Sequence, residues 1–236
     1  IMCDARVERD LLDRVFRRVV ARTFNMISVD GDQSTSDMVL CTANGASGAQ
    51  LSEEELEELL LPVCLSLSRE IVRNGEGTAH VIEVHVRGVR DQQLARRIGA
   101  HVVNSPLVKT AIYGRDPNVG RILAAVGDAL DTWDPRDTVD VSALSVAIAG
   151  RRVFEAGAFQ LDGEVERELA DYLSLTAMDP ALSGYPQNVL AVPIIVDFSG
   201  AARQGASHEA ADGEETVVVG SDLSYEYIRE NADYRT

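Results

Sequence analysis

The sequence has 236 residues, 45% of them hydrophobic, and its formal net charge at pH 7 is −16. The acidic balance argues against nucleic acid as a partner, because nucleic-acid-binding proteins carry basic patches. The composition suits a globular fold with a hydrophobic core, and no apolar run approaches the roughly 20 residues that cross a membrane.

The first half of the chain alternates apolar strand-like runs with segments in which apolar residues recur at helical spacing. Ser52 and Glu55 form a capping-box signature at the start of one helix, and Pro62 is expected to kink or split that helix. Strands are predicted at residues 1–3, 26–29, 38–42, 80–86 and 107–113. Helices are predicted at residues 8–24, 52–73, 92–103 and 118–130.

The second half repeats this alternation with shorter elements and two polar stretches. β-structure is predicted at residues 139–148, 152–154, 189–198 and 216–220, a helix at 164–173, a short helix or turn at 224–231, and surface loops at 176–187 and 199–215. The strict βαβ rhythm and the glycine pattern of a dinucleotide fold are missing, which predicts an α+β or layered α/β fold. A boundary near residues 131–140 predicts two domains, 1–134 and 135–236.

Residues 30–36, DGDQSTS, form a polar block between two apolar runs. Short polar loops of this kind place functional groups on a rigid scaffold. An EF-hand is excluded, because the sixth position from Asp30 is Thr35 and the twelfth is Cys41. The plainer alternative is a turn whose side chains bond the local backbone.

Three further segments each allow a functional and a plainer interpretation. Glu76, between two glycines, is either a carboxylate accessible to a ligand or a solvent-exposed residue after a helix end. Residues 116–121 open a helix and predict either an anion site or a capping turn. Aromatic and apolar residues continue to the C-terminus, which predicts a docked tail with a structural or a functional role.

The cysteines and histidines show no metal-site spacing. Cys3, Cys41 and Cys64 have no CxxC pattern, and the four histidines are scattered. This favours reduced thiols in a cytoplasmic protein, with no metal site.

Four segments, in this order, resemble the β chain of the glutamate N-acetyltransferase (ornithine acetyltransferase) family. They are TFNMISVDGDQSTSD, REIVRNGEG, VVNSPLVKTAIYGRDPNVGRILAAVGDA and SDLSYEYIRENADYRT. The resemblance covers residues 1–140 and 220–236 well. It implies a layered α-β-β-α sandwich with a smaller C-terminal lobe.

The resemblance also implies an activity. A precursor cleaves itself before a Thr, which becomes the nucleophile of the β chain and carries the acetyl group from N-acetylornithine to glutamate. The free α-amino group can serve as base, and the α chain supplies the oxyanion hole. No cofactor is expected. The expected partners are the α chain and amino-acid substrates, in a cytoplasmic assembly of two α and two β chains or larger, without nucleic acid or membrane.

The resemblance assigns substrate-binding roles to Glu76, Asn231 and Thr236, and places the nucleophilic Thr just upstream of Ile1. The sequence departs from the family pattern after the GEG motif, where Thr78-Ala79-His80 replaces Ala-Thr-Lys or similar, and at Val119, which replaces Trp. Three alternatives stay open: an N-terminal-nucleophile amidase, an acyltransferase of secondary metabolism with another amino-acid substrate, and a non-catalytic partner subunit without the nucleophile.

Overall fold

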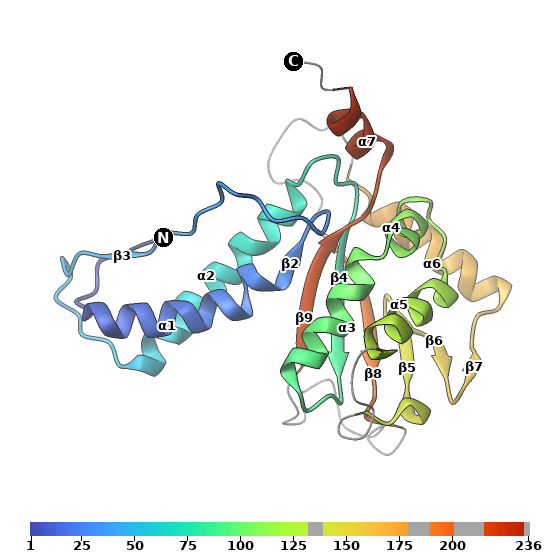
Figure 1. Cartoon of the computed structure of the whole chain (residues 1–236), viewed down its shortest axis with the longest axis horizontal. Coiled ribbons are helices and arrows are strands. Elements are labelled where there is room, and N and C mark those ends of the chain that lie inside the picture. The colour runs from blue at the N-terminus through green and yellow to red at the C-terminus, as the bar shows by residue number, and fades with distance from the viewer. Residues whose placement is uncertain (132–138, 179–188, 201–214, 234–236) are drawn as a thin grey trace. The chain divides into compact units, whose positions relative to one another are not determined.

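The computed structural model describes residues 1–131, 139–178, 189–200 and 215–233 (Figure 1). The chain forms two compact units. Unit 1 comprises Ile1–Ile27 and Asp32–Ile71, and unit 2 comprises Ser28–Gly31 and Val72–Thr236. In the described part of the chain, no helix is both long and apolar enough to cross a membrane.

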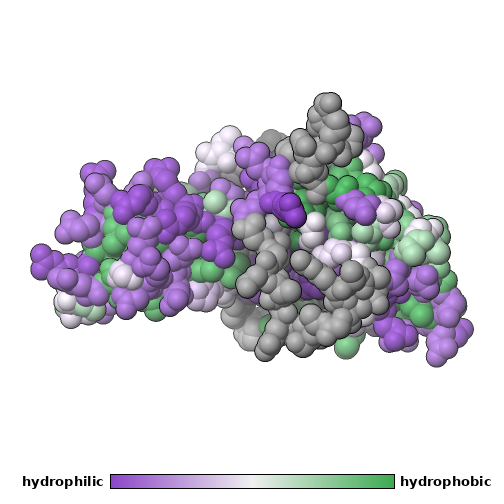
Figure 2. All heavy atoms as spheres, turned by 90° about the horizontal axis from the view of Figure 1, so that it is seen from below, coloured by the Kyte–Doolittle hydropathy of each residue, from purple (hydrophilic) through white to green (hydrophobic). Residues whose placement is uncertain are grey.

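Unit 1 is built on two helices, α1 (Arg9–Arg22) and α2 (Glu53–Arg73, whose last two residues belong to unit 2). The short strands β1 (Met2–Cys3) and β3 (Thr42–Ala43) pair in parallel, and a 3₁₀ turn, Phe24–Met26, follows α1. The small core consists of buried side chains from both helices: Val15, Val19, Leu56, Leu60 and Cys64. Hydrophilic residues cover most of the visible surface of this unit (Figure 2).

The start of α2 confirms the predicted capping box. The Ser52 hydroxyl accepts a hydrogen bond from the Glu55 amide at 3.2 Å, and the Glu55 carboxylate accepts one from the Ser52 amide at 2.8 Å. Pro62 does not split the helix, because the apolar face packs into the core on both sides of it through Leu60 and Cys64. The strand predicted at 38–42 was wrong for most of its length, because the observed strand β3 includes only Thr42 of this range. β3 is short because its partner β1 offers only two residues for pairing.

Within the described residues, the larger sheet has seven strands in the order β2-β9-β4-β8-β5-β6-β7. The strands are β2 (Ile27–Ser28), β4 (Val81–Arg87), β5 (Ser145–Ile148), β6 (Arg151–Glu155), β7 (Ala158–Phe159), β8 (Val192–Asp197) and β9 (Thr216–Ser221). The pair β4–β8 is parallel, whereas β4–β9, β5–β8, β5–β6 and β6–β7 are antiparallel. This mixed sheet with its helices confirms the expected α/β class.

One face of the sheet forms the main hydrophobic core. Ile82, Val84 and Val86 of β4 are fully buried and share this core with α3 (Gln92–Asn104), α4 (Pro106–Tyr113) and α5 (Val119–Asp131), which lie in front of the sheet in Figure 1. α6 (Gly163–Thr176) adds buried leucines, and α7 (Tyr225–Ala232) follows β9. A Cβ atom at Gly99 would lie 2.5 Å from Val218, so glycine permits the close packing of α3 on β9.

The strand predicted at 107–113 was wrong, because this segment is the helix α4. Ser105 is its N-cap and accepts a hydrogen bond from the Val108 amide, and Pro106 occupies the first turn. A short apolar run fits a buried helix as well as a strand, and the Ser-Pro start decides between them. Residues 141–143 form a 3₁₀ turn, so the strand predicted from 139 begins at Ser145.

The predicted domain boundary, residues 131–140, lies mostly outside the described residues. Strands from both sides of residue 134, such as β4 and β8, pair in one sheet, and the compact units divide near residue 72. The loops predicted at 176–187 and 199–215 also lie almost wholly outside the described residues.

Candidate functional site

The structure brings together two of the three residues to which the resemblance assigns substrate binding. The Asn231 side-chain amide, on α7, donates a hydrogen bond to Glu76 Oε2 at 2.9 Å across 155 positions of sequence. The same amide also bonds the Tyr227 carbonyl at 3.0 Å, which fixes its direction along the helix. Both side chains are exposed to solvent. Thr236 lies outside the described residues.

The glycine after Glu76 is required by the approach of α7. Gly77 has φ of +61°, and a Cβ atom there would lie 2.1 Å from the Tyr227 backbone nitrogen. Ser224, the N-cap of α7, accepts a hydrogen bond from the Tyr227 amide at 3.0 Å and donates one to the Gly77 carbonyl. The GEG loop and the first turn of α7 therefore pack backbone against backbone.

The polar block at residues 30–36 divides into two parts. Asp30, in unit 2, accepts a hydrogen bond from the Tyr227 hydroxyl at 3.1 Å and so lies beside α7. Ser34 and Ser36, in unit 1, bond each other, and the Ser36 amide donates to the Ser34 hydroxyl. This second part follows the plainer interpretation of a locally bonded turn.

Beneath the exposed pair lies a cluster of buried charged side chains, His80, Lys109 and Asp222, which we call the buried triad. Their exposed fractions are 2%, 4% and 3%. The Lys109 ammonium donates to the carbonyls of Val29 (2.6 Å) and Ser221. Burial lowers the pKa of Lys109 to about 8, and the neighbouring carboxylates of Asp222 and Asp30 oppose this shift.

Sequence reasoning missed the buried triad as a functional element. Lys109 is the only lysine in the sequence and stands in the apolar run LVKTAIY. A single charge inside such a run is unusual, because buried charges need partners. That signal could have identified Lys109.

Each departure from the family pattern places one residue in the protein interior, His80 and Val119, whereas Thr78 and Ala79 are partly buried. Val119 is 2% exposed and belongs to the main core. His80 is bonded to the Asp222 carboxylate at 2.6 Å and does not face the open surface where Glu76 lies.

The segment 116–121 behaves as a capping turn. The Asn118 side-chain oxygen accepts a hydrogen bond from the Arg121 amide at 3.2 Å, and the Arg121 guanidinium donates to the Leu107 carbonyl at 2.8 Å. These contacts account for the polar residues at this helix start without a ligand.

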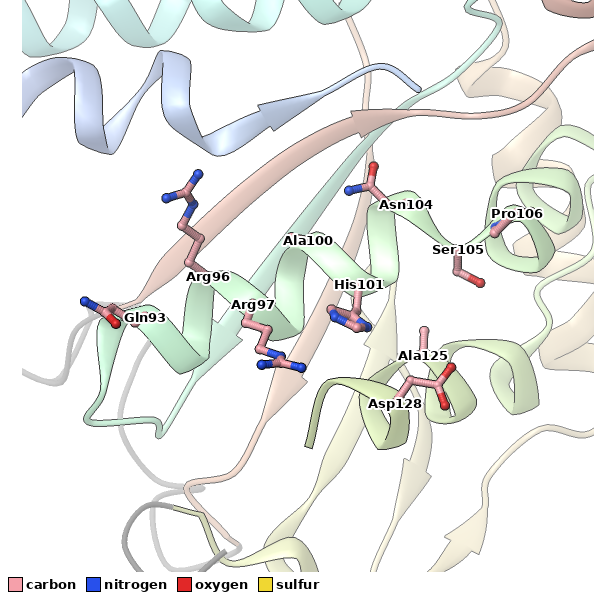
Figure 3. A pocket seen from close by; sticks show the side chains of 10 residues that line it. All are labelled: Gln93, Arg96, Arg97, Ala100, His101, Asn104, Ser105, Pro106, Ala125 and Asp128. Carbon is pink, nitrogen blue, oxygen red and sulfur yellow. The ribbon is translucent and has the colours of Figure 1, made fainter. Parts of the chain in front are cut away.

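A hollow of about 790 Å³ lies on unit 2 between α3 and α5, and among the described residues neither Glu76 nor Asn231 lines it. Figure 3 shows Arg97 and His101 of α3 on the side where Asp128 of α5 lies, whereas Arg96 points away. The hollow is a surface groove lined by residues of both charges, Arg96, Arg97 and Asp128 among them. Across the described ranges, no group of three or more His, Cys, Asp or Glu residues could hold a metal ion.

Comparisons with known proteins agree with the motifs. The sequence profile of the ArgJ family matches residues 1–236. The chain is 37% identical over 242 residues to the arginine biosynthesis bifunctional protein ArgJ of Thermosynechococcus vestitus, covering all of this chain and 54% of that protein. It is 38% identical over 239 residues to the glutamate N-acetyltransferase of Methanocaldococcus jannaschii, covering all of this chain and 53% of that protein.

A solved structure shows the same fold. The arginine biosynthesis bifunctional protein ArgJ of Bacillus halodurans superposes with a TM-score of 0.79 at 29% identity, over 99% of this chain and 98% of the matched chain. The chain thus spans about half the length of the curated relatives it matches and nearly the full length of one chain of a solved structure. The expected family is confirmed: this chain belongs to the ArgJ family.

Proposed function

We propose that this chain is the β subunit of an acetyltransferase that moves an acetyl group from N-acetylornithine to glutamate. The contact between Glu76 and Asn231 carries the proposal, because it joins two of the positions that match the family's substrate ligands. The names of the relatives, arginine biosynthesis bifunctional protein and glutamate N-acetyltransferase, support the same activity.

The chemistry of the pair suits an amino-acid substrate. A carboxylate offers about four lone-pair sites, so the bond from Asn231 leaves Glu76 free to accept further hydrogen bonds from a substrate ammonium group. The Asn231 carbonyl oxygen is an acceptor on the same side of α7. Thr236, the third position that the resemblance assigns, contributes a hydroxyl to this site.

The reaction follows a ping-pong course. The Thr hydroxyl upstream of Ile1 attacks the acetyl carbonyl of N-acetylornithine, its proton passes through the α-amino group to the departing ornithine amine, and an acetyl-Thr ester remains. The amine of glutamate then attacks the ester and releases the Thr. The α chain supplies the oxyanion hole for both tetrahedral intermediates. The role of this chain's described residues is to bind and orient the amino acid.

The first test is Glu76→Ala in the αβ complex. We expect KM for the amino-acid substrates to rise about 30-fold or more, since losing one partner of a charged hydrogen bond costs about 2 kcal/mol or more. Assembly of the complex is expected to stay intact, because Glu76 is exposed. The matched control is Glu230→Ala, an exposed carboxylate on α7. Normal kinetics in Glu76→Ala would remove Glu76 from the site.

The second test is the mass of the β chain after incubation of the complex with N-acetylornithine. The proposal requires the added mass of one acetyl group on the peptide that carries the N-terminal Thr. The absence of an adduct with any acyl donor would support a non-catalytic partner subunit instead. An adduct only with a different acyl donor would support an acyltransferase of secondary metabolism.

The partner and the assembly follow from the same proposal. The curated relatives are about twice as long as this chain, which supports an α chain derived from the same precursor. We expect two α and two β chains or a larger assembly in the cytoplasm, as the resemblance implies.

A further inference from the structure

We propose that Asp222 and His80 are positioning residues, which fix the GEG loop against α7 and thereby hold Glu76 and Asn231 in the geometry that binds an amino-acid substrate. This inference rests on the proposed function of Glu76. Neither residue touches the open site, so their effect is transmitted through the backbone segments that they join.

Two segments, 76–80 and 222–231, are joined by a series of hydrogen bonds that runs from the surface to the interior. At the surface Asn231 bonds Glu76, and one level below Ser224 bonds the Gly77 carbonyl. At the buried end Asp222 makes the remaining bonds. The exposed pair is thus the outer end of a series of contacts whose inner end is Asp222.

The Asp222 carboxylate is the strongest link in this series. Its Oδ1 atom accepts a hydrogen bond from the Ala79 amide at 2.9 Å, and its Oδ2 atom lies 2.6 Å from His80 Nδ1. The Asp222 amide also donates to the His80 carbonyl at 3.1 Å. The Asp222 side chain is fully buried, so these bonds are protected from competing water.

The hydrogen-bond partners of His80 determine how protons are shared. Nε2 lies 2.9 Å from the Leu173 carbonyl, which can only accept, so Nε2 carries a hydrogen. Nδ1 faces the Asp222 carboxylate, so one further proton is held between these two groups. The bond between His80 and Asp222 is therefore short and shielded from water at both ends.

Lys109 and Asp30 are two further charged groups near this corner. The Lys109 ammonium bonds the carbonyl of Ser221, the residue before Asp222, and the carbonyl of Val29, the residue before Asp30. Asp30 in turn accepts the Tyr227 hydroxyl bond from α7. Lys109 therefore supports the same helix from a second side.

The decisive experiment is a double-mutant cycle on KM in the αβ complex, with Glu76→Ala and Asp222→Asn. Asparagine keeps the shape of Asp222 but removes its charge, and we expect KM to rise roughly tenfold to a hundredfold, as for a small misplacement of a binding group. In the Glu76→Ala background the same substitution should raise KM clearly less than in the wild type, because the part of its effect that passes through Glu76 is then absent and only the part through Asn231 remains. Equal effects in both backgrounds would overturn the inference.

The control for a general loss of stability is Thr23→Val in unit 1. It removes a buried side-chain hydrogen bond, from the Thr23 hydroxyl to the Val19 carbonyl at 2.7 Å. We expect a lower melting temperature with unchanged KM. If Thr23→Val raised KM as much as Asp222→Asn, the Asp222 effect would be one of stability, and the positioning role would be rejected.

Amide hydrogen exchange of the same complexes separates this inference from the proposed function. Asp222→Asn should accelerate exchange at the Ala79 amide and along α7, while α1 and α2 keep their wild-type rates. A wild-type complex without acetyl transfer, or Glu76→Ala without effect, would count against the proposed function alone. Unchanged exchange at Ala79 and α7 would overturn the positioning role in either case.

Discussion

Two regions of the molecule use charged side chains in opposite ways: the surface between α1 and α2 in unit 1, and the buried triad in unit 2. In unit 1, arginines of α1 face glutamates of α2 across the surface, and the arginine side chains are 46–59% exposed. The members of this ion-pair ladder are Arg14, Arg18, Arg22, Glu53 and Glu57. In unit 2, each member of the buried triad is at most 4% exposed.

The difference matters because the free energy of a charge depends on its access to water. Exposed ion pairs contribute little to stability, whereas a buried charge without its partner is strongly destabilising. A hydrophobic cluster would stabilise the corner of unit 2 at least as well. The buried triad is therefore better explained by the positions that it fixes, since it lies directly beneath the GEG loop and α7.

The largest effect is expected for Asp222→Ala. This substitution leaves His80 and the Ala79 amide without their acceptor inside the protein, and breaking a buried pair in this way costs about 3–5 kcal/mol. Chemical denaturation of the complex measures the loss. A change as small as that of a surface substitution would mean that water reaches the corner and that the buried triad is not a closed network.

The second prediction is that the buried Lys109 makes the stability of the protein depend on pH. Its pKa of about 8 in the folded protein lies below the ordinary value of 10.5, so the unfolded chain binds more protons between these two values. Stability therefore rises with pH across this window, by an amount on the order of 3 kcal/mol. Below about pH 8 the contribution is constant and unfavourable.

The measurement compares the free energy of unfolding of the wild-type protein with that of Lys109→Met, each as a function of pH between about pH 7 and pH 10. Only the difference between the two curves belongs to Lys109, because Cys and Tyr groups titrate in both proteins. Since Lys109 is the only lysine of the chain, ¹³C-lysine labelling of this chain alone also follows its titration directly. Parallel stability curves would contradict the lowered pKa.

The third prediction concerns the backbone contact between the GEG loop and α7, and whether displacing it affects substrate binding. Gly77→Ala introduces left-handed strain, about 1–2 kcal/mol, and also displaces the Tyr227 backbone. Gly150→Ala is a matched control, with φ of +79° and open space around the new methyl group. Both should lower stability by the strain, but only Gly77→Ala should also raise KM. An equal KM in the two variants would show that α7 can be displaced without weakening substrate binding.

Local signals predicted those parts of the fold in which capping and periodicity agree. The helices predicted at 92–103 and 118–130 are Gln92–Asn104 and Val119–Asp131. The sheet order could not be predicted in this way, because the parallel pairing of β4 with β8 depends on contacts between distant segments. The error at α4 arose from an apolar run that fits two periodicities and a Ser-Pro start that was not used.

The candidate site was predictable in its residues but not in its geometry. Family motifs pointed to Glu76 and Asn231, yet no spacing rule connects residues 155 positions apart. The buried partners were missed because no local pattern connects His80, at the start of the alternating segment, with residues far away in the sequence. Its burial follows from Asp222 and Leu173, which arrive from distant parts of the chain.

The smallest effect is expected for the ion-pair ladder of unit 1. Glu57 accepts hydrogen bonds from Arg18 at 2.9 Å and Arg22 at 2.8 Å, and Glu57→Gln removes its charge while keeping its shape. Because the arginine partners are 46% and 59% exposed and such pairs contribute little to stability, we expect a melting temperature close to that of the wild type. Any difference should vanish in about 1 M salt, where the screening length is roughly 3 Å.

Glu58→Gln, at an exposed carboxylate one position along the same helix, controls for the change in net charge. If Glu57→Gln destabilised the protein as much as Asp222→Ala, at low and high salt alike, exposure would not distinguish the two regions. A small, salt-sensitive change at Glu57 beside a large, salt-insensitive one at Asp222 would instead establish that burial gives the charges of unit 2 their influence on the site.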